Sequence, residues 1–220
     1  MSNIEHLEES IEAHLEQVRQ ALAEFRDKFA VSFIVSISGG AEEHNTTYAH
    51  DVISQLIVGL KNSSCAILTG GTQGGIPELG TRIAREHKLS TIAVFPPKAK
   101  KYVLFNELDL PIETLPPSVG PAGFGSETPS FAQLPDYAVF IGGSYGTLAE
   151  VSTMMKVNTK RKKDNVEPIY IVPIAGSEGV AALIPLLVQL NPSLAFCLPE
   201  FELTTGAAAA EFIKETQSKR

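Results

Sequence analysis

The feature that most constrains the fold is a series of short segments that are apolar at nearly every position. Five of them are expected to form strands: residues 31–38, 64–69, 91–95, 137–141 and 169–174. Strands that are apolar on both faces are typical of a parallel sheet covered by helices on both sides. Segments with helical periodicity separate most of them, at about 47–61, 77–87, 147–160 and 180–190, with a last helix near 207–216. This alternation predicts an α/β fold with a Rossmann-like, doubly wound parallel sheet of at least five strands.

An added N-terminal helix is expected over residues 3–29. Its apolar residues recur at spacings of three and four: Ile4, Leu7, Ile11, Leu15, Val18, Leu22, Phe25 and Phe29. Two interpretations stay open, because such a helix either lies on its own domain or, at a spacing close to a heptad, dimerises with a second copy. We therefore divide the chain into a helix of residues 1–30 and a nucleotide-binding domain of residues 31–220, and expect a homo-oligomer, as a dimer.

Charge and cysteine content exclude several classes of protein. The formal net charge of the 220 residues is -7, whereas a nucleic-acid binder is usually basic, so no nucleic acid is expected as a partner. No apolar run reaches the roughly 18 residues of a membrane span, so no membrane is expected either. Cys65 and Cys197 lie far apart, and Cys65 lies in an apolar run that predicts a buried thiol. Together with the absence of a signal pattern, this indicates a cytoplasmic protein.

The first glycine-rich loop joins the second predicted strand to a helix. It holds four glycines in six residues, and its candidate ligand-binding residues are Gly70, Gly71, Thr72, Gly74 and Gly75. Glycines let the backbone approach a ligand, and the N–H groups at the start of a helix favour a phosphate. The alternative is a tight strand-to-helix turn that binds nothing. Four glycines exceed what such a turn needs, and this favours a phosphate site.

The second glycine-rich loop joins the fourth predicted strand to a helix. Its candidate ligand-binding residues are Gly142, Gly143, Ser144, Tyr145, Gly146 and Thr147. Glu150 stands three residues after Thr147, which matches a capping box, so its carboxylate has a structural role open to it. Its other possible role is chemical, as a carboxylate that binds the hydroxyls of a sugar or assists glycosidic cleavage. The spacing does not decide between the two.

A third loop follows the first strand and contains Gly39, Gly40 and His44. The carboxyl ends of parallel strands line one crevice, so all three loops are expected at the same edge of the sheet. His44 is expected as a polar residue at the rim. Residues 96–135 form a long, proline-rich connection, with a short helix or strand expected near 102–115, and connections of this length are usually functional. Lys98, Lys100 and Lys101 are candidates to reach a phosphate from it.

These motifs resemble a known superfamily. Residues 143–150, GSYGTLAE, resemble the PGGxGTxxE motif of the LOG or "lysine decarboxylase-like" proteins, and residues 70–76, GGTQGGI, resemble the glycine loop of the wider SLOG superfamily. Residues 35–41, VSISGGA, resemble the first strand and loop of the SLOG domains of TRPM channels, and Gly125-Ser126-Glu127 fits the same pattern. The resemblance covers about residues 31–190. It implies a Rossmann-like fold that binds nucleotides or ligands derived from NAD and ADP-ribose, with Glu127 and Glu150 orienting ribose.

The LOG enzymes imply a specific activity, the hydrolysis of the N-glycosidic bond of nucleoside 5′-monophosphates by the motif's glutamate and an upstream arginine. Glu150 matches that glutamate, but no arginine occurs between Arg85 and Arg161. Gly142 also replaces the motif's proline, and Ser144 its second glycine. These departures favour a sensor or binding protein for a nucleotide-derived, phosphorylated small molecule, with no cofactor and no metal. A nucleotide N-glycosidase with Glu150 as catalytic residue and a lysine from 98–101 in place of the arginine is the alternative, and an assembly module built on the N-terminal helix is a third.

Overall fold

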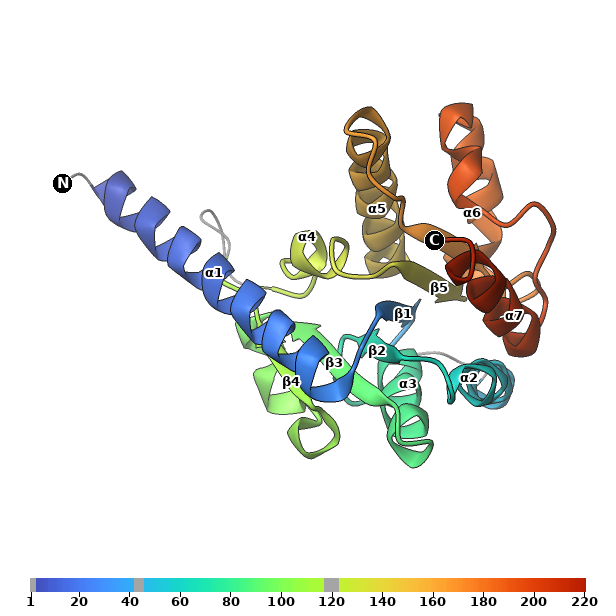
Figure 1. Ribbon diagram of the computed structural model, residues 1–220, viewed down its shortest axis with the longest axis horizontal. Coiled ribbons are helices and arrows are strands. Elements are labelled where there is room, and N and C mark those ends of the chain that lie inside the picture. Colours follow the sequence, from blue (N-terminus) through green and yellow to red (C-terminus); the bar gives the residue numbers. More distant parts are fainter. Residues whose placement is uncertain (1–2, 42–45, 117–122) are drawn as a thin grey trace.

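The computed structural model describes residues 3–41, 46–116 and 123–220, and the side chains of residues 3–10 and 46 lie outside this description. Within it, six strands form one sheet in the order β4-β3-β2-β1-β5-β6, with every neighbouring pair parallel (Figure 1). The strands are β1 (Phe33–Gly39), β2 (Cys65–Thr69), β3 (Ser90–Phe95), β4 (Leu110–Glu113), β5 (Tyr137–Ile141) and β6 (Tyr170–Pro173). The predicted parallel sheet is confirmed, and β1 starts two residues later than predicted.

Helices cover both faces of this sheet, as the apolar strands require. One face carries α2 (Thr46–Leu60), α3 (Gly75–Glu86) and α7 (Gly206–Gln217), whose buried side chains pack against Phe33, Val35 and Ile37 of β1. The other face carries α1 (Asn3–Phe29), α4 (Thr128–Phe131), α5 (Tyr145–Lys163) and α6 (Gly179–Gln189), which pack around Ile34. Successive β1 side chains therefore enter two different cores. Each of the long helices lies within a few residues of its predicted range.

The long proline-rich connection contains more structure than its sequence indicates. The structure shows two short 3₁₀ helices, η1 (Pro97–Tyr102) and η2 (Phe105–Glu107), then the edge strand β4, and later the four-residue helix α4. A third 3₁₀ helix, η3 (Pro192–Cys197), follows α6. Strand β4 falls within the predicted range of 102–115 and pairs with β3, with Val94 opposite Ile112. The sheet thus has one strand more than the five segments that the apolar pattern identified.

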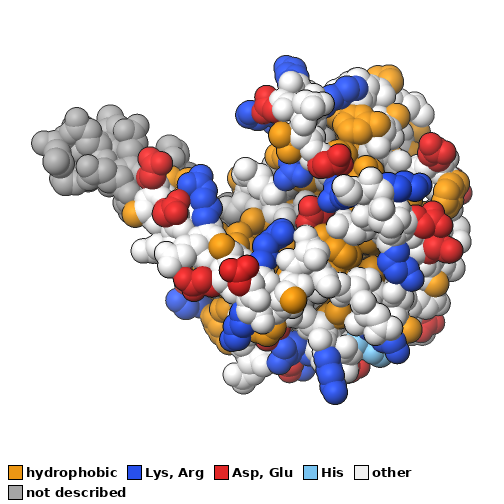
Figure 2. Space-filling model, in the orientation of Figure 1, with side chains coloured by type: hydrophobic (Ala, Val, Ile, Leu, Met, Phe, Trp, Pro, Cys, Tyr) orange, Lys and Arg blue, Asp and Glu red, His pale blue; other side chains and the backbone are white. Residues whose placement is uncertain are grey.

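The N-terminal helix α1 is attached to the domain at its C-terminal end. Phe25 is buried in the core on the α5 side of the sheet, and Val18, Leu22 and Phe29 pack against that core. Farther from the domain, Ile11 and Leu15 are 38% and 44% exposed, and the helix extends away from the sheet (Figures 1 and 2). The side chains of Ile4 and Leu7 lie outside the described residues. The later half of α1 therefore lies on its own domain, whereas a dimer through the earlier half stays a prediction.

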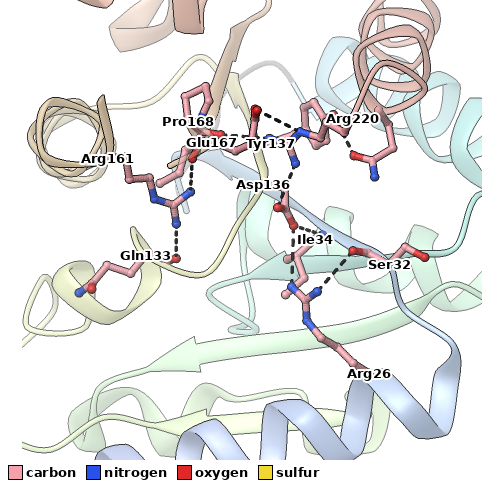
Figure 3. Close-up of polar contacts among 12 residues, drawn as sticks. Arg26, Ser32, Ile34, Gln133, Asp136, Tyr137, Arg161, Glu167, Pro168 and Arg220 are labelled. Carbon is pink, nitrogen blue, oxygen red and sulfur yellow. Dashed lines mark hydrogen bonds and ion pairs between the residues drawn. The ribbon is translucent and has the colours of Figure 1, made fainter. Parts of the chain in front are cut away.

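Asp136 organises the amino edge of the sheet, where β1 and β5 begin (Figure 3). Its carboxylate accepts a hydrogen bond from the backbone N–H of Ile34 at 2.9 Å and pairs with Arg220 at 3.1 Å and Arg26 at 3.8 Å. The Arg220 guanidinium also lies over the ring of Tyr137, at 5.1 Å from the centroid. This one carboxylate therefore ties α1, β1, β5 and Arg220 together at the edge opposite the glycine loops.

The described helices differ from membrane-spanning helices. Among the described residues, none of the helices combines the length and the apolar character that crossing a bilayer requires.

Candidate functional site

A cavity of about 390 Å³ lies at the carboxyl edge of the sheet, where the three glycine loops meet. Nine of the residues predicted for the site line it: Gly39, Gly40, Gly70, Thr72, Glu127, Ser144, Gly146, Thr147 and Glu150. The other predicted residues do not: Gly71, Gly74, Gly75, Gly142, Gly143 and Tyr145. His44 lies outside the described residues. The expected convergence of the loops thus holds in the structure, but only part of each loop faces the cavity.

Close packing against the third loop explains Gly74 and Gly75, which do not line the cavity. Gly75 has a φ of +51°, and a Cβ there would lie 2.2 Å from the carbonyl oxygen of Gly40. The next residue, Ile76, donates its backbone N–H to that same oxygen at 3.0 Å. The first and third loops therefore touch through backbone atoms. The sequence places this glycine correctly at a close approach, but the approach is to protein and not to a ligand.

The start of α3 already has an acidic partner. Glu78, in the first turn, accepts a hydrogen bond from the backbone N–H of Gly74 at 2.7 Å. This bond and the neighbouring Arg82 lower the pKa of Glu78, so its carboxylate is ionised at neutral pH. Negative charge at a helix N-terminus satisfies the N–H groups and the dipole that a phosphate would otherwise use. The first glycine loop is therefore the weaker of the two predicted phosphate sites.

The second glycine loop is held in place by α6. Gly142 and Gly143 accept hydrogen bonds from the backbone N–H groups of Ala181 and Val180, at 3.0 and 3.1 Å, and Gly142 donates to Ser177 Oγ at 3.0 Å. Gly143 has a φ of +93°, and a Cβ there would lie 2.4 Å from Thr147 Oγ1. The two glycines therefore fix the loop against its neighbours and leave the residues that follow them to face the cavity.

The start of α5 is open. Ser144 precedes the helix and makes no side-chain capping bond, and no acidic residue lies in the first turn. The first N–H groups of a helix have no partner within the helix, so those of Gly146 and Thr147 are available as donors at the cavity wall. Space is open around Gly146, where a Cβ would meet nothing within 4 Å. Tyr145, in contrast, is 89% exposed and outside the cavity.

The structure excludes one of the two roles considered for Glu150. A capping box would need a helix that starts after Thr147, but α5 begins at Tyr145, so Glu150 lies in its second turn. The capping interpretation is therefore wrong. The side chain lines the cavity together with Ser38 and Glu127.

Glu150 has an unusual electrostatic environment. Burial raises the pKa of its carboxyl group to about 7, the Ser38 hydroxyl lowers it, and the nearby Glu127 raises it further. Ser38 is only 3% exposed, and its Oγ has no hydrogen-bond partner of normal geometry among the described residues. The pKa of Glu127 is also raised, mainly by burial, although its Oε2 accepts the Gly125 N–H at 2.8 Å. The cavity thus contains two carboxyl groups and one buried hydroxyl with unused hydrogen-bonding capacity.

Residues 124–131 form a cavity wall of which the sequence identified only Gly125-Ser126-Glu127. Phe124, Gly125, Thr128 and Phe131 line the cavity from this segment. Phe95 and Ala99 line it from the end of β3 and from η1. Apolar residues in a proline-rich connection carry no periodic signal, so their position follows only from the packing of the chain.

The three lysines predicted to reach a ligand do not line the cavity. Lys98, Lys100 and Lys101 are exposed, and Ala99 is the residue of η1 that faces the cavity. Lys100 pairs with Glu113 at 2.7 Å, and Lys101 lies over the Tyr102 ring. Among the described residues no Lys, Arg or His lines the cavity. The expectation that these lysines reach a ligand, or replace the missing arginine, is therefore wrong for the cavity as it stands.

Several solved structures have the same fold. TM1055 is 16% identical, with a TM-score of 0.63 over 83% of this chain and 99% of that one. The molybdenum cofactor carrier protein from Chlamydomonas reinhardtii is 19% identical, with a TM-score of 0.59 over 84% and 98%. The single-stranded-DNA-binding DNA processing protein A from Helicobacter pylori is 13% identical, with a TM-score of 0.55 over 86% and 83%. At these identities the likeness shows a shared fold.

Sequence comparison gives the family. No curated protein sequence matches the chain. The model of the SLOG cluster4 family matches residues 32–161, which include the three glycine loops, Glu127 and Glu150. The match covers more than half of the chain and agrees with the order of the motifs along it. The chain therefore belongs to the SLOG cluster4 family.

Proposed function

We propose that this cavity binds a phosphorylated, nucleotide-like small molecule and that the protein acts as a sensor or ligand-binding protein. One observation carries the proposal: the open N-terminus of α5 faces the same cavity as the buried Ser38 hydroxyl and the carboxyl groups of Glu127 and Glu150. An anion site beside unused acceptors and a buried hydroxyl suits a ligand that has a phosphate at one end and hydroxyls at the other.

The phosphate is assigned to α5. Its first-turn N–H groups are free of acidic partners, and the hydroxyls of Ser144 and Thr147 line the same wall. Backbone N–H groups and the helix dipole together favour a phosphate without any lysine or arginine. The α3 terminus, already paired with Glu78, serves in this proposal to shape the cavity.

The sugar is assigned to the two carboxyl groups. Carboxylate oxygens accept hydrogen bonds from ribose hydroxyls, and a carboxyl group that keeps its proton donates one as well. Ser38 and Thr72 add hydroxyls to the same cavity. Ligands with this layout include nucleoside monophosphates and molecules related to ADP-ribose or NAD.

The structural relatives widen the set of ligands to be tested. Proteins named molybdenum cofactor carrier or binding proteins and a single-stranded-DNA-binding protein share the fold. The ligand panel therefore contains AMP, ADP-ribose, cyclic ADP-ribose, NAD, molybdenum cofactor and a single-stranded oligonucleotide. The net charge of -7 makes the oligonucleotide the weakest of these candidates.

The test compares Gly146→Asp with Gly146→Asn, which differ in charge and hardly in size. Open space around Gly146 accommodates either side chain, and an acidic residue in the first turn stabilises the helix by about 0.3–1 kcal/mol. We expect calorimetry to show at least tenfold weaker binding of AMP, or of the best panel ligand, for the aspartate variant. Binding of adenosine, which lacks the phosphate, is expected to change little.

Three results would contradict this proposal. The first is an absence of thermal shift with every panel ligand at millimolar concentration. The second is equal loss of affinity in the aspartate and asparagine variants, because charge would then not matter. The third is an equal effect on AMP and adenosine, because the phosphate would then lie elsewhere.

The raised pKa of Glu150 supports a second candidate, a nucleotide N-glycosidase. With a pKa of about 7, the carboxyl group holds a proton in a large share of molecules at neutral pH. It would donate this proton to the departing base while water adds to C1′ and gives its own proton to the Glu127 carboxylate. Chromatography of AMP incubated with the protein would show free adenine, lost in Glu150→Gln and kept in the surface variant Glu211→Gln. If AMP binds and no adenine is released, the N-glycosidase candidate is overturned and only the binding function remains.

A further inference from the structure

Helix α6 presents an apolar face to solvent. Residues 179–199 contain no charged side chain. One side of α6 is buried in the domain through Val180, Ile184 and Val188. On the other side Leu183, Leu186 and Leu190 are 46%, 55% and 84% exposed. Residues at these spacings share one helix face, and a helix that is apolar all round is normally buried on both sides.

The apolar surface continues beyond the helix. Phe196 in η3 is 44% exposed, and Phe201, in the segment that lies beside Ala182 and Pro185, is 64% exposed. We call this surface the α6 face and define it by Leu183, Leu186, Leu190, Phe196 and Phe201. Large apolar side chains exposed along one helix and in the segments after it mark an interaction site more often than they stay in water.

Opposite charges flank the two ends of the α6 face. At the C-terminal end of α6, Lys162 of α5 donates to the carbonyl of Ser193 at 2.8 Å and lies over the Phe196 ring, with Lys163 beside it in the last turn of α5. Lys160, in the same turn, is paired with Asp164. Near the N-terminal end, Glu178 precedes α6, and Glu200 and Glu202 belong to the segment beside Ala182 and Pro185. Figure 2 shows hydrophobic and basic side chains together over the region of α5 and α6.

We propose that the α6 face binds the same face of a second copy of this chain, with the two α6 helices antiparallel about a two-fold axis. In such a symmetric interface every contact occurs twice: where one residue of the first copy contacts another residue of the second copy, the same two residues also make contact with the copies exchanged. The antiparallel arrangement places the acidic end of each α6 face against the basic end of the other. An unrelated partner would need to match both the apolar strip and this charge order, whereas a second copy matches both by symmetry. This interface differs from the predicted dimer through α1.

Light scattering after size exclusion tests the interface at two positions. The expected mass of the unmodified chain is twice 23.6 kDa. The double variant Leu186→Glu/Leu190→Glu is expected to run as a monomer. Leu15→Glu on α1 is the matched control, because Leu15 is similarly exposed at 44%, and it is expected to remain dimeric. Far-UV circular dichroism checks that each variant is folded.

Charge exchange tests the antiparallel arrangement. Glu200→Lys/Glu202→Lys is expected to weaken the dimer at least tenfold in sedimentation equilibrium, because like charges then meet. Adding Lys162→Glu/Lys163→Glu to the same chain is expected to restore it. If the unmodified protein is a monomer at 100 µM, the proposal is overturned, and the α6 face would bind a different protein. A dimer that Leu15→Glu disrupts and the α6 variant does not, or a charge exchange without rescue, also overturns it.

Discussion

Replacing Glu150 with glutamine should make the protein more stable, by an amount that grows as the pH rises above about 4.5. The carboxyl group has a pKa of about 7 in the folded protein, against an ordinary value of 4.5. The folded state therefore holds this proton more tightly than the unfolded chain does. As the pH rises from 4.5 to 7, the unfolded chain releases the proton first, so unfolding becomes easier. Above pH 7 the full cost of an ionised Glu150 is present, and glutamine avoids that cost.

The size of the effect follows from the pKa difference. A tenfold change in proton affinity corresponds to about 1.4 kcal/mol, so the difference between 4.5 and about 7 corresponds to about 3 kcal/mol. This figure is the upper limit, because the cavity admits water that screens the charge. We expect the free energy of unfolding of Glu150→Gln to equal that of the parent near pH 4 and to exceed it by about 2–3 kcal/mol at pH 8.

Urea denaturation at half-unit intervals from pH 4 to 8.5 measures this difference. Glu211→Gln, which removes an exposed carboxylate from α7, serves as the matched control and should show no such rise. A gain for Glu150→Gln that does not depend on pH would refute the reasoning, because it would arise from packing and not from the proton. A loss at pH 8 would refute it more directly, since Glu150 would then be stabilising as an anion.

Three more predictions concern the scaffold. Arg220→Ala should lower the free energy of unfolding by about 1–2 kcal/mol in urea, because it removes two ion pairs and stacking on two tyrosines, and an unchanged midpoint would contradict this. Gly75→Ala should cost about 2 kcal/mol or more, since its Cβ meets a carbonyl oxygen at 2.2 Å, and Gly146→Ala, whose Cβ meets nothing within 4 Å, should cost clearly less. Burial raises the pKa of Cys65 to about 12 and of Cys197 to about 11, so neither thiol should react with Ellman's reagent at pH 8 without denaturant, and prompt reaction of either would contradict its burial.

The sheet was predictable because its strands carry a direct physical signal. Strand β5 is apolar at every position, and the structure buries Val139 in one core and Phe140 in the other. Strand β4 gave no comparable signal, because it is a four-residue edge strand that includes Pro111 and has half-exposed positions. A short edge strand is fixed by its pairing with β3 more than by its own composition.

The candidate site was predictable in its location and less so in its detail. Convergence of three loops follows from parallel topology alone. The topology does not show which backbone groups of the loops remain free, because this depends on tertiary partners. Glu78 accepts a hydrogen bond at the start of α3, and α6 donates to Gly142 and Gly143. The role of Glu150 depended on where α5 begins, and helix ends are set by local contacts that a motif spacing does not reveal.

Polar groups have partners at the amino edge of the sheet and lack them at the carboxyl edge, and this difference bears on function. At the amino edge Asp136 is matched by a backbone N–H and two arginines. At the carboxyl edge Ser38 has no partner of normal geometry among the described residues, and Glu150 is disfavoured as an anion. Unpaired buried polar groups cost about 1–3 kcal/mol each, and those that line the cavity are within reach of a bound molecule. Hydrogen bonds that the fold leaves unmade at this edge are the ones that a bound ligand can make.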